Sequence, residues 1–325
     1  MQRRTLLSAL AAAGASTAAP WASAQADYPN QLIRWVVPYP AGGGTDVLAR
    51  TVAEAMRQTL GQQIVVDNRP GASTNIGGQA VATAKADGYT IMSADNAILA
   101  YNEHLFSKLP FSPQNDFTYV GGISRFPLAL VVHPSFEAKT MKEFLAYVRA
   151  NPGKVNYASP GNGSPHHLAM EMFKNRTKTF LTHIPYRGAA PAMADVMGGQ
   201  VPCMFLDLAS GLSVIQSGKV RALAIGSAKR IATLPDVPTL GEVGVADTEV
   251  FAFQGILGPK GLPANVTQRL NADLNKALAS PAVVKRMQDF GMEALPGTPE
   301  QFRALARAEA KRWGEVIKAA GVKLD

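Results

Sequence analysis

The sequence predicts an α/β fold arranged in two lobes. Short apolar runs, glycine-rich loops and helical patterns alternate along the chain, which is typical of folds built on a mainly parallel sheet. The same unit of strand, glycine loop and helix occurs near residue 40 and again near residue 160. The 325 residues are 47% hydrophobic and 17% charged, so the chain can bury a large core and is neither disordered nor a membrane bundle.

The first 24 residues are expected to be a cleaved export signal. Arg3 and Arg4 precede a short apolar stretch over residues 6–19, and residues 22–24 (ASA) have the small-x-small form of a signal peptidase site. The paired arginines partly match the twin-arginine (Tat) pattern, so Tat-like and Sec export both stay open. No later stretch reaches the roughly 18 consecutive apolar residues of a spanning helix. The mature chain, residues 25–325, is predicted to be periplasmic.

Strands and helices alternate through the first part of the mature chain. Apolar runs predict strands over residues 32–37, 64–66 and 89–92. Helices are predicted between them, from residue 45 to residue 60 and over residues 76–86. The first helix has an apolar residue at every fourth position and is followed by Gly61, which suits a helix end.

The alternation resumes after residue 127. Further strands are predicted over residues 128–132, 155–158, 201–205 and 222–225. Two helix starts have capping signals: Thr140 and Glu143 have the spacing of a capping box, and Ser164 precedes a proline that suits the first helical position. A short helix is predicted near residues 212–216. Past Phe251 the chain is expected to become helical, over residues 265–279, 282–289 and 300–320.

Two candidate crossings divide the chain into lobes. Residues 124–127 and 247–253 each join a polar or turn-rich stretch to an apolar run. The expected first lobe therefore comprises residues 25–125 and 250–325, and the second lobe residues 126–249. A chain that crosses twice forms a hinge over a cleft, where a ligand can bind.

Charge and cysteine content exclude several classes of site. Lys and Arg exceed Asp and Glu by 32 to 24, a net charge of +8, but the excess is spread along the chain, which disfavours nucleic acid as a partner. The single cysteine, Cys203, cannot form an intrachain disulfide or a multi-cysteine zinc site. No metal or cofactor is expected.

The first glycine loop lies between a predicted strand and a helix start. Its residues are Tyr39, Pro40, Ala41, Gly42 and Gly43. Glycines allow close approach to the backbone, and free amides at a helix start favour a carboxylate or phosphate. The loop lacks the spacing of the dinucleotide and P-loop fingerprints. It is either an anion site or a tight turn packed on the sheet.

A second loop has the same placement in the other lobe. Its candidate residues are Ser159, Gly161, Asn162, Gly163 and Ser164. Two facing anion sites would let a ligand with two polar ends bridge the lobes. His166 and His167 follow, but adjacent helical residues point in different directions and lack the spacing of metal ligands. A polar role in the first turn is expected for both.

Further candidates follow other strands. Asn75 begins a helix after a glycine-rich segment and either caps it or lines the cleft. Ser93 and Asn96 are expected at the carboxyl end of the third strand, where open α/β sheets bind ligands. Tyr186 follows a strand of the second lobe. Asp207 is expected to receive a hydroxyl or ammonium group, or to cap a local turn.

No enzyme motif is present. The sequence has no G-x-S-x-G, no H-E-x-x-H and no recognisable Cys–His pair. A triad can be scattered along a chain, and Ser, His and Asp are all present. Nothing in the pattern, however, proposes a reaction.

Six motifs occur in order along nearly the whole mature chain. They are YPAGGGTD (39–46), NRPGA (68–72), NIG (75–77), GNGSP with HL (161–165 and 167–168), HIPY (183–186) and LPDVPT (234–239). Together these motifs resemble the Bug (TctC) family, the periplasmic receptors of tripartite tricarboxylate transporters.

The resemblance implies a type II periplasmic binding protein fold, or Venus flytrap, that closes on a small carboxylate. The ligand would be held by the two glycine loops, and His167 matches the family histidine. His166 stands where the family often has serine. The family varies near Asp207, which makes this residue a specificity candidate. Neither enzyme activity nor a cofactor is implied.

The expected function is capture of a small organic carboxylate for two integral membrane transporter subunits, by a monomer. A di- or tricarboxylate, an aromatic carboxylate and an acidic amino acid all fit, because backbone amides recognise the carboxylate alone. A sensor that docks a membrane signalling protein is the alternative, since it would use the same cleft.

Overall fold

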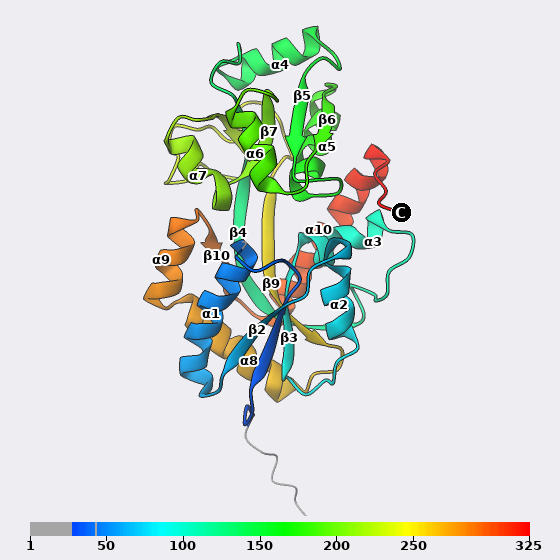
Figure 1. Cartoon of the computed structure of the whole chain (residues 1–325), viewed down its shortest axis with the longest axis vertical. Coiled ribbons are helices and arrows are strands. Elements are labelled where there is room, and N and C mark those ends of the chain that lie inside the picture. Colours follow the sequence, from blue (N-terminus) through cyan, green and yellow to red (C-terminus); the bar gives the residue numbers. More distant parts are fainter. Residues whose placement is uncertain (1–27, 43) are drawn as a thin grey trace, which may run out of the picture.

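A computed structural model describes residues 28–42 and 44–325, and the predicted export signal lies outside them. Figure 1 shows two lobes stacked along the long axis of the molecule and joined by long strands. The confirmed fold class is therefore α/β with two lobes. No helix in the described ranges combines the length and apolar character that a bilayer span needs.

Lobe 1 is defined by the sheet drawn in the lower half of Figure 1. Its strands are β1 (Ile33–Val37), β2 (Ile64–Asn68), β3 (Thr90–Asp95), β9 (Phe251–Pro259), β10 (Glu293–Ala294) and the first part of β4 (Phe117–Val132). Its helical segments are α1 (Gly44–Leu60), a 3-10 turn (Ala72–Thr74), α2 (Asn75–Ala82), a π-helical turn (Ala97–Tyr101), α3 (Asn102–Leu105), α8 (Ala264–Leu278), α9 (Pro281–Asp289) and α10 (Pro299–Ala320).

Lobe 2 is built on the end of β4 and on strands that follow it. These strands are β5 (Asn156–Ser159), β6 (Thr182–Pro185), β7 (Cys203–Asp207) and β8 (Arg221–Ile225). The helices of this lobe are α4 (Met141–Ala150), α5 (Pro165–Thr177), α6 (Ala189–Met197) and α7 (Leu208–Gln216).

Strand β4 passes from one lobe into the other without a break. Its residues 117–127 pair with β9 in antiparallel register, and its residues 128–132 pair with β7 and β8. The main strand order is β2-β1-β3-β9-β4-β7-β5-β6, with β8 and β10 also pairing with β4. The two lobes therefore share one continuous ladder of strands.

Residues 251–259 form strand β9, so the prediction that the chain becomes helical past Phe251 was wrong there. The strand lies between β3 and β4 and is almost entirely buried. A Cβ on Gly255 would come within 2.4 Å of the Gly121 carbonyl oxygen, so glycine is needed where the two strands meet. The predicted helices beyond it correspond to α8, α9 and α10.

The predicted helix starts are confirmed. Thr140 and Glu143 form a capping box on α4, and Ser164 caps α5 with proline at its first position. These signals are local, because both partners of each cap lie within one helical turn.

Helix α10 packs against both lobes. Phe302 and Ala306, near its start, belong to a core cluster of lobe 1, whereas Trp313 and Ile317 belong to a cluster made mainly of lobe 2 residues. The apolar side of one helix thus crosses the lobe boundary, and Figure 1 shows its C-terminal end beside α5.

The only cysteine is buried in lobe 2. Cys203 begins β7, is fully buried, and its Sγ contacts the Asn156 carbonyl oxygen at 3.4 Å. Burial raises the pKa of the Cys203 thiol, which keeps it protonated and unreactive.

Candidate functional site

The carboxyl ends of the parallel strands point toward the lobe boundary in both lobes. In lobe 1, β1 is parallel to β2 and β3, and in lobe 2, β5 is parallel to β6 and β7. Helices α1, α5, α6 and α7 begin where such strands end, and these ends face each other across the boundary in Figure 1. Open α/β sheets bind ligands at this edge, near helix N-termini that favour negative charge.

The first glycine loop is held by the carboxylate of Asp46, in the first turn of α1. This carboxylate accepts hydrogen bonds from the Gly42 amide and Asn68 Nδ2, each at 2.9 Å, and from Arg50 Nε. Burial raises the pKa of Asp46, but hydrogen bonds from Arg50, Gly42 and Asn68 outweigh it and lower the pKa to about 2. At Gly42 the predicted anion site is therefore filled by the chain itself. Gly43 lies outside the described residues.

The remaining residues of this loop differ in exposure. The Tyr39 hydroxyl donates to Asp95 Oδ2, at the end of β3, and burial raises the pKa of Tyr39. Pro40 and Ala41 are exposed. Tyr39 thus links the loop to β3, and the next two residues present the loop to solvent at the lobe boundary.

The second glycine loop is held from within by side chains of its own flanks. Ser159 Oγ accepts from the Gly161 amide at 3.1 Å, and His167 Nδ1 accepts from the Gly163 amide at 3.1 Å. Ser164 Oγ caps α5 by accepting from the His167 amide at 3.3 Å. The amide of Asn162 has no acceptor among the described residues. The side chains therefore hold the loop on both sides of this amide.

Three aromatic rings stack behind the second loop. The His183 ring lies between those of Tyr157 and His167, with centroid distances of 4.8 and 4.0 Å. His183 Nε2 lies 2.6 Å from Ser159 Oγ. Burial lowers the pKa of both histidines, to about 4 for His183, where His167 adds to the effect. Two neutral histidines therefore support the loop.

His166 and Asp207 form a pair between the starts of α5 and α7. His166 Nε2 lies 3.0 Å from Asp207 Oδ2, and each residue is 8% exposed. Asp207 also caps α7, accepting from the Ser210 amide and hydroxyl at 2.8 Å each. Burial raises the pKa of Asp207, but the hydrogen bonds from His166 and Ser210 outweigh this effect and lower the pKa overall. Asp207 therefore caps a helix, which is one of its two predicted roles.

Ser93 lies in a different place from the one expected, whereas Asn96 lies at the expected end of β3 but is buried. Ser93 lies inside β3, not after it, because β3 continues to Asp95 through its pairing with β9. Its hydroxyl accepts from Trp35 Nε1 at 2.9 Å, and the residue is 1% exposed. Asn96 does follow β3, but it is fully buried and accepts from the Phe253 amide at 2.7 Å. Both side chains are committed to partners of the core.

Asn75 and Tyr186 also have partners within their own lobes. Asn75 is the first residue of α2 and does not cap it; its Oδ1 accepts from Asn102 Nδ2 at 2.8 Å. The Tyr186 hydroxyl donates to Asp195 Oδ2 at 2.6 Å, and burial raises its pKa to about 12. These residues position the loops after β2 and β6.

No sequence signal points to the residues that join the lobes beside the second loop. A Cβ on Gly163 would lie 2.9 Å from Leu105 Cδ1 and 3.0 Å from Leu324 Cδ1. On the other side, a Cβ on Gly291 would lie 3.2 Å from Leu208 Cβ, at the start of α7. These contacts join residues far apart in the chain, so no local pattern reveals them.

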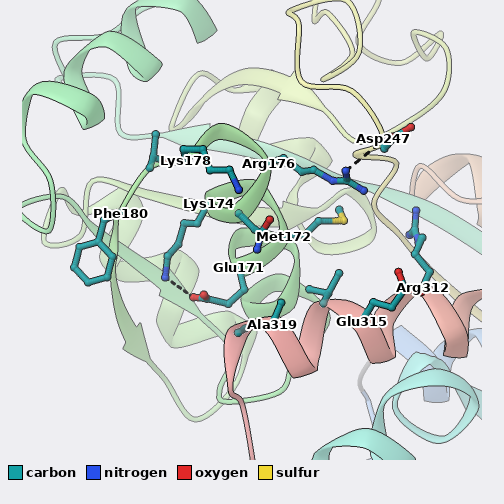
Figure 2. Close-up of a pocket in the computed structure, with 14 residues that line it drawn as sticks. Glu171, Met172, Lys174, Arg176, Lys178, Phe180, Asp247, Arg312, Glu315 and Ala319 are labelled. Atoms are coloured by element: carbon teal, nitrogen blue, oxygen red, sulfur yellow. Dashed lines mark hydrogen bonds and ion pairs between the residues drawn. The ribbon is translucent and has the colours of Figure 1, made fainter.

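Two cavities lie apart from the candidate residues. The larger, of about 630 Å³, is lined by the end of α5, by Asp247 and by the C-terminal half of α10. Figure 2 shows Lys174 paired with Glu171 and Arg176 paired with Asp247 on its wall. The second, of about 570 Å³, lies beside residues 226–233 and β10. Neither is lined by a residue of the two glycine loops.

No metal centre is found within residues 28–42 and 44–325. These ranges contain no group of three or more His, Cys, Asp or Glu side chains placed to hold a metal ion.

A two-lobed α/β fold with helix N-termini facing the lobe boundary defines the class of periplasmic binding proteins. The family model of the tripartite tricarboxylate transporter family receptor, TctC, matches residues 48–322. Protein BugT of Bordetella pertussis is 37% identical over 298 residues, covering 91% of each chain. The chain therefore belongs to the TctC family, as the sequence motifs predicted.

Solved structures agree with this assignment. The periplasmic binding protein BugD has a TM-score of 0.79 and 37% identity, with 91% of this chain and 99% of that one covered. Rpa4515 of R. palustris, solved with adipate, has a TM-score of 0.83 and 33% identity over 91% and 99% of the two chains. MatC of Rhodopseudomonas palustris, with bound malate, has a TM-score of 0.78 and 32% identity over 89% and 100%. The periplasmic binding protein fold is thus confirmed.

Proposed function

We propose that this receptor captures a small organic carboxylate between its lobes and delivers it to two integral membrane subunits of a tripartite tricarboxylate transporter. The N-terminus of α5 carries the proposal. There Ser164, Gly161 and Gly163 build an ordered loop at the lobe boundary with a free amide at Asn162. The adipate and malate found with Rpa4515 and MatC support a dicarboxylate as the ligand.

In the proposed complex, the lobes close without a covalent step. The Asn162 amide and the dipole of α5 bind one carboxylate group from lobe 2. The exposed loop at Pro40 and Ala41 approaches from lobe 1. Tyr39, Ser159, His167 and Tyr186 position the loops, through the hydrogen bonds that they make inside their own lobes.

The proposal includes the boundaries of the lobes and the location of the protein. Residues 25–125 and 250–325 form the first lobe and residues 126–249 the second, with α10 extending onto the second. The first 24 residues direct export to the periplasm, where the receptor acts as a monomer.

Thermal unfolding of the mature protein against a panel of carboxylates tests the binding. Co-purified ligand is removed first, and ionic strength is kept equal. A ligand at about 100 times its Kd stabilises the native state by about 2.7 kcal/mol, which raises the melting temperature by several degrees. A shift with one or a few di- or tricarboxylates supports the proposal. A flat response from folded, ligand-free protein contradicts it.

Uptake tests the transporter role separately. Cells that express the receptor together with its two membrane subunits should accumulate a radiolabelled form of the carboxylate that binds. Cells that lack the receptor should not accumulate it. Uptake that is unchanged without the receptor would favour the sensor alternative.

A further inference from the structure

A buried imidazole nitrogen at the start of α5 has no hydrogen-bond partner. His166 Nδ1 is inaccessible to solvent and pairs with no atom among the described residues. The side chain of His166 is 10% exposed, and its other nitrogen, Nε2, contacts Asp207. A buried polar atom without a partner destabilises the fold, so its retention at this position calls for an explanation.

The unpaired atom lies at the lobe boundary. Gly163, three residues before His166, faces Leu105 and Leu324. Leu208, the residue after Asp207, faces Gly291 of lobe 1. Contacts between the lobes therefore flank the His166–Asp207 pair on both sides, along the edge of the sheet where β5 and β7 are neighbours.

The contact between His166 and Asp207 also determines whether His166 Nδ1 needs a hydrogen-bond donor or an acceptor as its partner. An ionised carboxylate only accepts hydrogen bonds, so His166 Nε2 carries a proton toward Asp207. Asp207 is held in this ionised form by its bonds from His166 and Ser210. In the neutral form of this ring, Nδ1 has a lone pair, which accepts a hydrogen bond and cannot donate one.

We propose that His166 Nδ1 accepts a hydrogen bond from the bound solute, so that the receptor prefers carboxylates bearing a hydroxyl or ammonium group over plain alkanedioates. The inference rests on the proposed function and deepens it. Lobe 2 supplies the Asn162 amide for a carboxylate at the second glycine loop, and His166 forms a hydrogen bond with the neighbouring substituent. His166 is thus a specificity residue for the solute.

Malate and succinate test the inference, because they differ by one hydroxyl group. Calorimetric titration of the mature, ligand-free protein at about pH 8, where a typical histidine is neutral, should show about tenfold tighter binding of malate than of succinate. Aspartate, with an ammonium group at the same carbon, should also bind more tightly than succinate.

The variant His166→Phe keeps a ring but removes both nitrogens. We expect it to bind malate and succinate equally, through loss of malate affinity alone. His133→Phe replaces a histidine outside both glycine loops and should keep the preference for malate. Thermal unfolding of the free variants verifies folding, and His166→Leu provides a second variant without ring nitrogens if the phenylalanine is too large.

The titrations distinguish the proposed role of His166 from the proposed capture of a carboxylate. Equal binding of malate and succinate by the unmodified protein would overturn the inference while leaving carboxylate capture intact. A preference that persists in His166→Phe would also overturn it. Loss of succinate affinity as large as that of malate would assign His166 a structural or cationic role instead. If none of the three acids, nor any other carboxylate, binds, the proposed function fails together with the inference.

Discussion

The rings of His167 and His183 lie stacked, with centroids 4.0 Å apart and planes 5° from parallel. Both rings hold the second glycine loop, His167 through the Gly163 amide and His183 through Ser159. Protonation would place two positive charges face to face and would remove the lone pair that accepts from Gly163. The stack therefore makes the order of the loop depend on pH.

Stability should fall as the pH is lowered from about 6.5 to about 4. Burial lowers the pKa of His167 and His183 in the folded chain, to about 4 for His183. The unfolded chain takes up protons near the ordinary value of 6.5, so it binds more protons in this window and unfolding is favoured. Melting temperatures of the free protein across this range measure the effect. His183→Asn should flatten the dependence and His133→Asn should not; equal slopes in both variants would refute the assignment.

Ser164→Ala should weaken both stability and carboxylate binding. The substitution removes the cap that accepts from the His167 amide, at a cost of about 1 kcal/mol. Thr140→Ala removes a similar cap from α4, far from both loops, and serves as the control. Denaturant unfolding should show similar losses for both, and titration should show weaker binding for Ser164→Ala alone. A Kd that is unchanged in Ser164→Ala would exclude this helix start from the site.

Gly163→Ala should cost more than Gly61→Ala. Both glycines have φ of 73°, so alanine meets the same left-handed strain of about 1–2 kcal/mol at each. Gly61 has open space around a new Cβ, whereas at Gly163 the Cβ would contact Leu105 and Leu324 across the lobe boundary. The difference between the two free energies of unfolding isolates that contact. Equal losses of unfolding free energy in the two variants would show that Leu105 and Leu324 move aside without destabilising the protein.

Asp46→Asn should destabilise the protein and remove part of its acid sensitivity. The pKa of Asp46 is lowered to about 2 in the folded chain, below the ordinary value of 3.8. Its stabilisation is therefore complete above pH 3.8 and is lost as the pH falls through 2. Loss of charged hydrogen bonds from the buried carboxylate should cost about 1.5–3 kcal/mol at neutral pH, measured by denaturant unfolding. Glu54→Gln, which breaks an exposed pair with Arg57, should change stability little; an equal effect would contradict the role of burial.

The variant Ser93→Ala tests whether Ser93 is a core residue or a ligand contact. The Ser93 hydroxyl accepts from the Trp35 indole and is buried inside the sheet. Its removal leaves that donor unpaired and should cost about 1–3 kcal/mol of stability. Carboxylate affinity should stay the same when both proteins are fully folded. A large rise in the Kd for the carboxylate would instead show that Ser93 contributes to ligand binding.

Local patterns predicted the fold and the two loops, but not the partners of their side chains. The caps at Thr140 and Ser164 depend on residues three positions away, so the sequence revealed them. Ser93 pairs with Trp35, 58 positions earlier, and Asn96 with Phe253, 157 positions later. Such pairs form only when the sheet assembles.

His166 illustrates the same limit. The sequence placed it in the first turn of a helix, which the structure confirms. Its pairing with Asp207, at the start of α7, and its unpaired Nδ1 can be recognised only in the folded structure. The role in ligand choice that we propose for His166 therefore depends on tertiary structure.

The buried thiol of Cys203 makes the receptor convenient for spectroscopy. Because the chain has one cysteine and burial keeps its sulfur protonated, maleimide or nitroxide reagents should leave the native protein unlabelled. Cysteines introduced on the outer faces of the two lobes can then carry a fluorophore pair without removal of Cys203. The distance between the dyes would report directly, in real time, whether a bound acid brings the two lobes together.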